Sequence, residues 1–410
     1  MMTSSKLADW SKRVGAMFAF GLCVALIPLS FYLGAKALSI LWLLLLVSYS
    51  IGAAFAALLG VVLGPTMGFS RLATGSGAAA MTVIIVGIPT AWLALSSPPR
   101  LGAAEPDPRG PHQNWVLATG SRLAVWPLYG EGVRRRTPIL VIHGGPGEFT
   151  PASLMHYGAP LRAAGFDTIY FDQAGVGASD LIPISEYTFS RAIADVEAMR
   201  QHLGLEKIVL WGQSYGAMLA AAYAFKYPAH VAGLLLTSIG PFPGLDLPND
   251  RTKIKPRQAT DVGVKLTLHA MLIDLNPRLA EQWIDQSDSR TMWNAVYERS
   301  DHRGGGCKDS LEEPEPERMP LGFNLFSGEL IEKDFLRMSF NGPQQVLAPT
   351  LIIRGECDFV ARGAALRYAA VFFPSRVVDV PGAPHQLNTQ RHLINAAVSQ
   401  FVTGELENVP

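Results

Sequence analysis

Charge is distributed very unevenly along this chain, and that distribution limits what the chain can fold into. Only Lys36 and Arg71 are charged in the 84 residues from 14 to 97, whereas residues 98–410 carry 62 charged side chains. A helix that crosses a membrane needs about 20 apolar residues. Three stretches reach that length, at roughly residues 14–34, 37–63 and 78–97. The sequence therefore predicts that residues 1–97 form a membrane segment with about three transmembrane helices.

The first apolar stretch has a second interpretation, a cleaved signal peptide, because Ala35-Lys36-Ala37 fits a small-residue cleavage site. The stretch is longer than the apolar region of a signal peptide, and two more follow it, so we favour a membrane anchor. Flanking cations number four on the N-terminal side of the predicted membrane and three on the other, which predicts a cytoplasmic N-terminus. An odd number of crossings then places the C-terminal domain outside the cytoplasm, in an integral protein of the plasma membrane.

Small residues recur every four positions in the second apolar stretch, at Gly52, Ala56 and Gly60. Such a stripe lets two helix backbones approach closely. We interpret it as packing within the membrane segment rather than as a dimer signal, and the sequence indicates no oligomeric state.

The rest of the chain has the charge balance of an ordinary domain. Residues 98–410 hold 29 basic and 33 acidic side chains, so no basic field marks a binder of nucleic acid. Five prolines lie between residues 98 and 114, which predicts an irregular linker. A folded domain is expected from residue 115.

Short apolar runs alternate with helical patterns along this domain. Runs that are apolar on both faces are typical of a parallel sheet buried between helices, and helices are predicted at 189–203 and 215–227. The pattern predicts a doubly wound, mostly parallel α/β fold. The six predicted strands lie at 139–144, 167–173, 208–213, 233–238, 350–355 and 376–382.

One region breaks the alternation. Residues 241–345 contain helical fragments but no strand-like run, and they include an acidic, proline-rich segment, Glu312–Glu317, that we interpret as an exposed loop. We predict a helical cap inserted between two parts of the α/β core, residues 115–240 and 346–410.

Gly212-Gln213-Ser214-Tyr215-Gly216 follows a predicted strand and opens a predicted helix. In that context a G-x-S-x-G motif forms a sharp turn that exposes the serine hydroxyl. Side chains at the two glycine positions would clash with the neighbouring strand and helix. We predict that Ser214 is a nucleophile, with a structural serine as the alternative.

A serine hydroxyl needs a base to take its proton and a carboxylate to orient that base. In one known chain order both partners follow the serine, the acid first. Asp358 and His385 each come just after a predicted strand, at the strand ends where sites of open α/β sheets gather. Glu356 is the rival acid, and His392 is the other histidine that follows both.

The oxyanion of acyl transfer needs N–H donors aimed at it. Tyr215 N–H is one candidate, because it follows the nucleophile. The loop His143-Gly144-Gly145-Pro146-Gly147 comes after the first long strand, and Gly144 or Gly145 is predicted to supply the second donor. His143 precedes the serine and ends a buried strand, so we interpret it as an anchor of its loop rather than as the base.

Three motifs therefore occur in one order: His-Gly-Gly-Pro-Gly at 143–147, Asp-Gln-Ala-Gly-Val-Gly-Ala-Ser at 172–179, and the Ser214 turn. With them, residues 115–410 resemble an α/β-hydrolase of the proline iminopeptidase family. The resemblance implies a triad of Ser214, Asp358 and His385 beneath a helical cap. The chain departs from the family pattern at Ala174 and Ala217, which bears on the substrate and not on the catalytic groups.

The resemblance also implies that glutamates of the cap hold the free ammonium group of the substrate. The segment from Trp293 to Glu298 loosely resembles the one that supplies such a glutamate. Glu298 is therefore a candidate substrate-binding residue, and a solvated helix carboxylate is the alternative.

Three hypotheses of function follow. The leading one is a membrane-anchored serine hydrolase that forms an acyl-enzyme on Ser214 and releases N-terminal residues, proline by preference, from short peptides. The second is a carboxylesterase or lipase-like enzyme that uses the same triad on small or lipidic esters. The third, a non-catalytic membrane receptor on a hydrolase fold, is disfavoured because all three triad positions are occupied.

No motif predicts a metal site, a phosphate-binding loop or a cofactor. The expected partners are a small peptide or ester substrate and the lipid bilayer. Of three cysteines, Cys23 lies in the first apolar stretch, so Cys307 and Cys357 are the candidates for a disulfide in an oxidising compartment. The sequence leaves open whether they pair.

Overall fold

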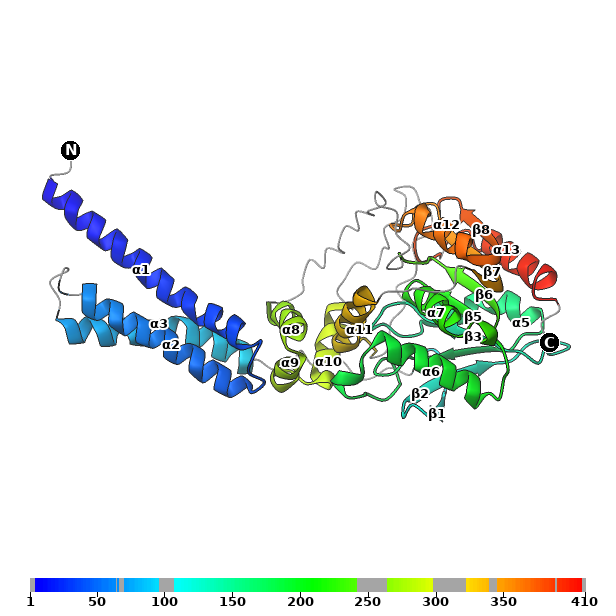
Figure 1. Cartoon of the computed structure of the whole chain (residues 1–410), viewed down its shortest axis with the longest axis horizontal. Helices are drawn as coiled ribbons and strands as arrows, with labels where there is room; N and C mark the ends of the chain where they lie inside the picture. Colours follow the sequence, from blue (N-terminus) through cyan, green and yellow to red (C-terminus); the bar gives the residue numbers. More distant parts are fainter. Residues whose placement is uncertain are drawn as a thin grey trace. The chain divides into compact units, whose positions relative to one another are not determined.

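The computed structural model describes residues 4–63, 65, 70–95, 107–241, 264–297, 322–338, 345–387 and 389–407. The chain divides into two compact units, each described here by itself (Figure 1). The helical unit comprises Met1–Pro98 and Gly263–Asp285, and the sheet unit comprises Pro99–Val262 and Gln286–Pro410. Part of the region predicted as the cap thus groups with the N-terminal helices.

The sheet unit is built on one mixed sheet of eight strands in the order β1-β2-β4-β3-β5-β6-β7-β8. Strand β2 runs antiparallel to both of its neighbours, and the pairs from β4 to β8 are all parallel. The prediction of a mostly parallel α/β sheet is confirmed. The strands are β1 (Gln113–Val116), β2 (Arg122–Leu128), β3 (Ile139–Ile142), β4 (Thr168–Phe171), β5 (Ile208–Gln213), β6 (Val231–Thr237), β7 (Val346–Gly355) and β8 (Phe372–Val380).

Helices cover both faces of this sheet, as the strands with two buried faces require. On one face Val141, Trp211 and Ile353 join a buried apolar cluster with Leu161 and Phe401 of the covering helices. On the other face α7 lies directly against β5. The helices of this unit are α4 (Ala152–Tyr157), α5 (Ala159–Ala163), α6 (Phe189–His202), α7 (Tyr215–Lys226), α10 (Gln286–Tyr297), α11 (Leu325–Arg337), α12 (Arg362–Val371) and α13 (Arg391–Gly404), with 3₁₀ turns at Ile184–Glu186 and Pro228–His230.

The helical unit contains α1 (Ser4–Gly34), α2 (Leu41–Leu63), α3 (Arg71–Leu95), α8 (Val264–Leu275) and α9 (Pro277–Trp283). Among the described residues, α2 is the one helix long and apolar enough to cross a membrane. The expectation of about three such helices is corrected to one candidate. The apolar parts of α1 and α3 are shorter, Val24–Gly34 and Thr74–Thr90.

The small-residue stripe of α2 packs inside the helical unit. Ala56 is fully buried, and a side chain at Gly60 would come within 2.4 Å of the carbonyl oxygen of Thr74 on α3. The Thr74 hydroxyl donates a 2.7 Å hydrogen bond to the Gly60 carbonyl oxygen. The stripe therefore brings α2 and α3 into backbone contact, as the interpretation of intramolecular packing expected.

Candidate active site

Ser214 stands at a sharp turn between β5 and α7. Its backbone has φ 52° and ψ −118°, a left-handed conformation that is costly for a residue with a side chain. A Cβ at Gly212 would lie 2.3 Å from the Gly216 carbonyl oxygen, and one at Gly216 would lie 2.2 Å from the Ile142 carbonyl oxygen. Only glycine fits at either position, so the two glycines permit the strained turn that presents the hydroxyl.

The structure brings Ser214, His385 and Asp358 into one hydrogen-bonded row. His385 Nε2 lies 2.9 Å from Ser214 Oγ, and His385 Nδ1 lies 2.7 Å from Asp358 Oδ1. The side chains of His385 and Asp358 are 11% and 1% exposed. Because the carboxylate accepts from Nδ1–H, it keeps the imidazole in the tautomer whose Nε2 accepts the serine proton.

Neighbouring groups hold this row in place. Val360 N–H donates a 2.8 Å hydrogen bond to the same Asp358 oxygen that accepts from His385. The ring of Phe359 lies against the imidazole with a centroid distance of 4.1 Å. The Ser238 hydroxyl donates to the His385 carbonyl oxygen. Sequence reasoning missed Phe359 and Ser238, since neither belongs to a motif.

The two rival residues lie elsewhere. Glu356 is exposed, and its carboxylate accepts a 2.9 Å hydrogen bond from Gly382 N–H, so it orders the loop after β8. His392 is exposed on α13. The geometry therefore distinguishes Asp358 from Glu356 as the partner of His385.

The glycine loop after β3 lies beside Ser214. A Cβ at Gly144 would meet Ser214 Cβ at 3.4 Å, and Gly145 has φ 125°. Within the described part of the chain, the N–H groups of Gly144, Gly145 and Tyr215 donate to no other residue. Donors placed next to the serine and free of protein partners are what an oxyanion requires.

His143 links this loop to the next one along the sheet edge. Its Nε2 accepts a 3.1 Å hydrogen bond from Gln173 N–H, and its Nδ1 lies 2.7 Å from the Gly144 carbonyl oxygen. Burial lowers the pKa of His143 to about 4. A neutral histidine with both ring nitrogens engaged orders two loops, the anchoring role that the sequence suggested.

Asp172, the first residue of the second motif, binds several groups of the loops at this edge of the sheet. Its carboxylate accepts from Thr150 N–H at 2.9 Å, from Ala178 N–H at 2.8 Å and from the Arg109 guanidinium at 2.8 Å. The Arg109 and Asp172 side chains are 2% and 0% exposed. This buried pair therefore holds the loops after β3 and β4 to the segment that precedes the sheet.

Glu148 is a carboxylate of the site that sequence reasoning missed. One of its oxygens lies 3.6 Å from the Cβ position of Gly144, and Ser214 Cβ lies 3.4 Å from the same point. The carboxylate is therefore no more than about 7 Å from the nucleophile side chain. The available signal was its place directly after His-Gly-Gly-Pro-Gly. Glu298, the glutamate that we had singled out, lies outside the described residues.

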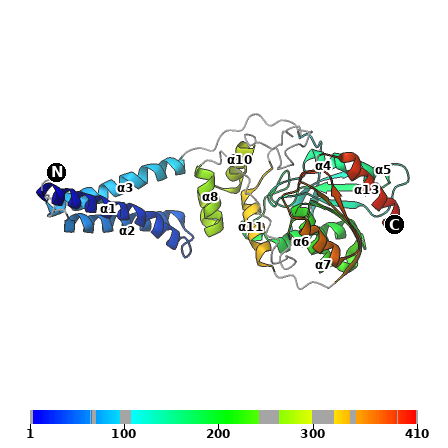
Figure 2. The ribbon, with the colours of Figure 1, turned by 90° about the horizontal axis from the view of Figure 1, so that it is seen from above.

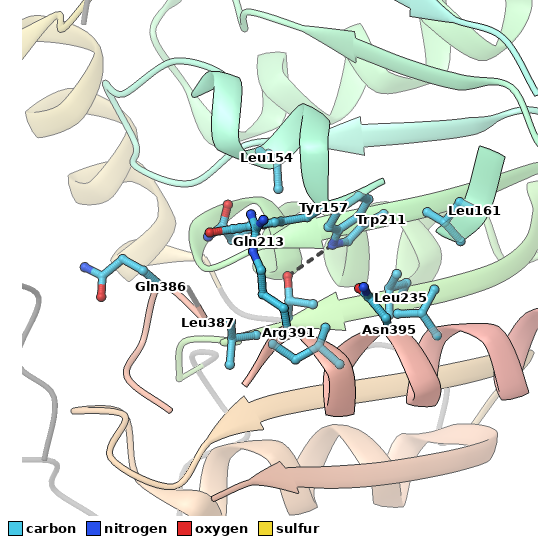
Figure 3. Close-up of a pocket in the computed structure, with 13 residues that line it drawn as sticks. Leu154, Tyr157, Leu161, Trp211, Gln213, Leu235, Gln386, Leu387, Arg391 and Asn395 are labelled. Atoms are coloured by element: carbon cyan, nitrogen blue, oxygen red, sulfur yellow. Dashed lines mark hydrogen bonds between the residues drawn. The ribbon is translucent and has the colours of Figure 1, made fainter. Parts of the chain in front are cut away.

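A small cavity lies next to the site (Figure 3). Its volume is about 30 Å³, enough for about one water molecule and too little for a substrate. Gln213 and Gln386, chain neighbours of Ser214 and His385, line it with Trp211. It is a packing defect behind the catalytic loops rather than a substrate pocket.

Among the described residues, neither cysteine side chains nor metal ligands take part in the hydrogen-bonded row of Ser214, His385 and Asp358. Cys357, the neighbour of Asp358, is disulfide-bonded, and Cys307 lies outside the described residues. Among the described residues, no group of histidine, cysteine and carboxylate side chains is placed to hold a metal ion.

Comparison with known proteins bears on the same part of the chain. A family model described as alpha/beta hydrolase fold matches residues 137–390. The chain is 36% identical over 110 residues to a probable proline iminopeptidase of Streptomyces coelicolor, which is 25% of this chain and 32% of that protein. It is 34% identical over 133 residues to a putative proline iminopeptidase of Mycoplasma pneumoniae, 32% of this chain and 41% of that protein.

These matches span less than half the length of the relatives concerned. A proline iminopeptidase of Saccharolobus solfataricus is similar in the same way, with 37% identity over 102 residues, 24% of this chain and 32% of that protein. Among solved structures, an esterase from Exiguobacterium antarcticum matches 72% of this chain and 100% of its own, with 17% identity and a TM-score of 0.49.

Proposed function

Because this chain belongs to the alpha/beta hydrolase fold family, we propose that it is a membrane-anchored serine hydrolase of the proline iminopeptidase type. It would release an N-terminal residue, proline by preference, from short peptides. The observation that carries the proposal is the row of hydrogen bonds from Ser214 through His385 to Asp358. The relatives named as proline iminopeptidases support the substrate class.

The proposed reaction uses this row twice. Ser214 Oγ attacks the carbonyl carbon of the first residue while His385 Nε2 takes the hydroxyl proton. The same imidazole gives that proton to the leaving amine, the peptide C–N bond breaks, and an ester remains on Ser214. A water molecule, deprotonated by His385, then attacks the ester, and the imidazole gives the proton to Ser214 Oγ as the free amino acid leaves.

Two backbone donors stabilise the tetrahedral intermediates in this scheme. Tyr215 N–H and one N–H of Gly144 or Gly145 would point at the developing oxyanion. Asp358 stabilises the imidazolium form of His385 and keeps its orientation during both proton transfers.

An enzyme that removes N-terminal residues must also recognise a free ammonium group. In a substrate the ammonium nitrogen is two bonds from the attacked carbonyl carbon, so its partner must lie within several ångströms of Ser214. Glu148 meets that condition. We propose that it is an ammonium ligand, alone or together with Glu298.

We further propose that α2 takes part in anchoring the enzyme in the plasma membrane, with the catalytic domain on the extracytoplasmic side. The support is the length and apolar composition of α2 and the excess of basic residues at the N-terminus.

A comparison of three substrates on the detergent-solubilised chain tests the proposal. We expect cleavage of proline p-nitroanilide, loss of that cleavage when the proline nitrogen is acetylated, and slower turnover of p-nitrophenyl acetate. Glu148→Gln should raise KM for the anilide and leave the ester unchanged, with Glu298→Gln as the matched variant. Ester turnover alone would identify an esterase, and no labelling of Ser214 by a serine-directed phosphonate would identify a non-catalytic protein.

A further inference from the structure

Helices α8 and α9 of the helical unit lie beside the turn that joins α1 to α2 (Figure 1), and Figure 2 shows α8 at the same end of α2 from above. Asn276 Nδ2 donates a 2.8 Å hydrogen bond to the Ala35 carbonyl oxygen. The Gln282 amide donates to the Ser39 carbonyl oxygen at 2.7 Å and accepts from Leu41 N–H at 2.9 Å. These are backbone groups at helix ends, which have no partner inside their own helix. Two amide side chains of the inserted segment thus cap the end of α1 and the start of α2.

This contact restricts how the chain can cross a membrane. Residues 35–41 and residues 276–282 must lie on the same side, so the chain between them crosses an even number of times. If α2 crosses, a second segment must return. The apolar part of α3, Thr74–Thr90, has 17 residues, which is the lower end of the length that spans a bilayer. The backbone contact between Gly60 and Thr74 joins α2 to α3, as a hairpin of two crossing helices requires.

Helix α8 is apolar on two faces. One face, with Leu266, Leu272 and Ile273, is buried. Val264, Leu268 and Met271 lie on the other at helical spacing i, i+4 and i+7, and they are 67%, 38% and 64% exposed.

An exposed apolar stripe of this kind is costly in water and favourable in the interfacial layer of a bilayer, where a helix can lie with its apolar side inserted. The tie to the turn between α1 and α2 places this stripe at the end of the proposed hairpin, where the chain leaves the membrane. The contacts that hold α8 and α9 to this turn and the apolar stripe that α8 exposes therefore indicate the same partner. That partner is the lipid bilayer.

We infer that α2 and α3 cross the bilayer as a hairpin and that α8 lies on the bilayer surface at the end of the hairpin that holds the turn between α1 and α2, with Val264, Leu268 and Met271 inserted among the lipids. This inference rests on the membrane anchoring proposed above and does not depend on the reaction. Its consequence is that the segment inserted after β6 is bound to the membrane at a second place in the sequence, more than 160 residues after α3.

Photolabelling of the full-length chain in phospholipid vesicles tests the inference. Vesicles of phosphatidylcholine and phosphatidylglycerol would carry a diazirine on the acyl chain, and tryptic peptides would be examined for attached lipid. The peptide 266–278 holds Leu268 and Met271, while 37–71 and 72–100 cover α2 and α3. The peptide 368–376 is the matched control, because it contains Phe373, which is 60% exposed on the sheet unit.

We expect lipid on 37–71, 72–100 and 266–278, each severalfold above 368–376. Changing Leu268 and Met271 together to glutamate should bring 266–278 down to the control and leave the α2 peptide labelled. Label on 37–71 with none on 266–278 would overturn the inference and leave the anchoring intact. Absence of label from 37–71 would overturn both. The anilide assay on the same vesicles reports the proposed activity separately.

Discussion

The loops around Ser214 and the N-terminal helices are specified by their sequences in opposite ways. At the Ser214 turn, individual residues decide the structure, since a single added carbon at Gly212 or Gly216 would overlap backbone atoms. Along most of α1 and α3 the apolar composition as a whole determines the structure. A Cβ added at Gly21 or Gly77 would meet nothing within 4 Å. A sequence motif is therefore informative about the first region, whereas only length and apolar content are informative about most of the second.

The largest effect that we expect in this comparison is at the nucleophile. Ser214→Ala removes the attacking oxygen, and losses of about 10⁶-fold in kcat are typical when a triad serine is removed. The measurement is anilide hydrolysis together with labelling by a fluorescent phosphonate. Ser399→Ala, an exposed serine on α13, is the control and should behave like the wild type. Phosphonate labelling that persists in Ser214→Ala would assign the nucleophile elsewhere.

The acid of the row gives the next largest effect. Asp358→Asn keeps the shape but favours the wrong imidazole tautomer, and a loss of about 10⁴-fold in kcat is expected. Glu356→Gln, two residues away, changes a carboxylate that accepts from Gly382 N–H and should cost less than about tenfold. Steady-state kinetics of the two variants, measured side by side, show which carboxylate the reaction requires. Equal losses would mean that the loop, and not the contact with His385, requires the charge.

The same contrast explains how far the sequence could be interpreted. The six parallel strands and the positions of Ser214, Asp358 and His385 could be predicted, because buried apolar runs and a strand-turn-helix motif are local patterns. Strands β1 and β2 were missed. Strand β1 is four residues long and mostly exposed, so it has no apolar run, and Pro127 interrupts the apolar run of β2.

Features that depend on contacts between distant segments could not be predicted. The approach of Glu148 to Ser214 depends on the conformation of the glycine loop after β3. Asn276 and Gln282 bind a turn about 240 residues earlier in the chain. The local sequence around an amide side chain does not indicate which distant group it will bind. The number of membrane-crossing helices was overestimated because apolar content alone set the count, whereas the apolar parts of α1 and α3 among the described residues, Val24–Gly34 and Thr74–Thr90, are shorter than that of α2.

Glycine substitutions test the contrast itself. In Gly216→Ala the new carbon would overlap the Ile142 carbonyl oxygen, and we expect a loss of about 3 kcal/mol in the free energy of unfolding. Gly77→Ala, inside α3 with open space around it, should gain up to about 1 kcal/mol from helix propensity. Gly60→Ala is the exception within the N-terminal helices, because its carbon would overlap the Thr74 carbonyl oxygen. Thermal unfolding of the three variants in one detergent measures these differences, and similar values for Gly60→Ala and Gly77→Ala would refute the close contact of α2 with α3.

The last effect concerns two buried histidines, one in each unit. Burial lowers the pKa of His143 and of His269 to about 4, against about 6.5 in an unfolded chain. As the pH falls from 6.5 towards 4, the unfolded chain binds a proton at each site while the folded chain does not, so stability decreases through that window. Between pH 7 and pH 5 each site should remove about 2 kcal/mol from the free energy of unfolding.

Replacing either histidine by glutamine should flatten this dependence on pH. Because the two residues belong to different units, His143→Gln should reduce the loss in the sheet unit and His269→Gln the loss in the helical unit. Urea titrations at pH 7 and pH 5, followed by proteolysis of the unfolded chain and identification of the peptides, separate the two units. His143→Gln should also leave the pH dependence of kcat/KM unchanged, since the proposed base is His385 and not His143. A shift of that profile in His143→Gln would show that the two histidines titrate together, and the separation of anchor from base would then fail.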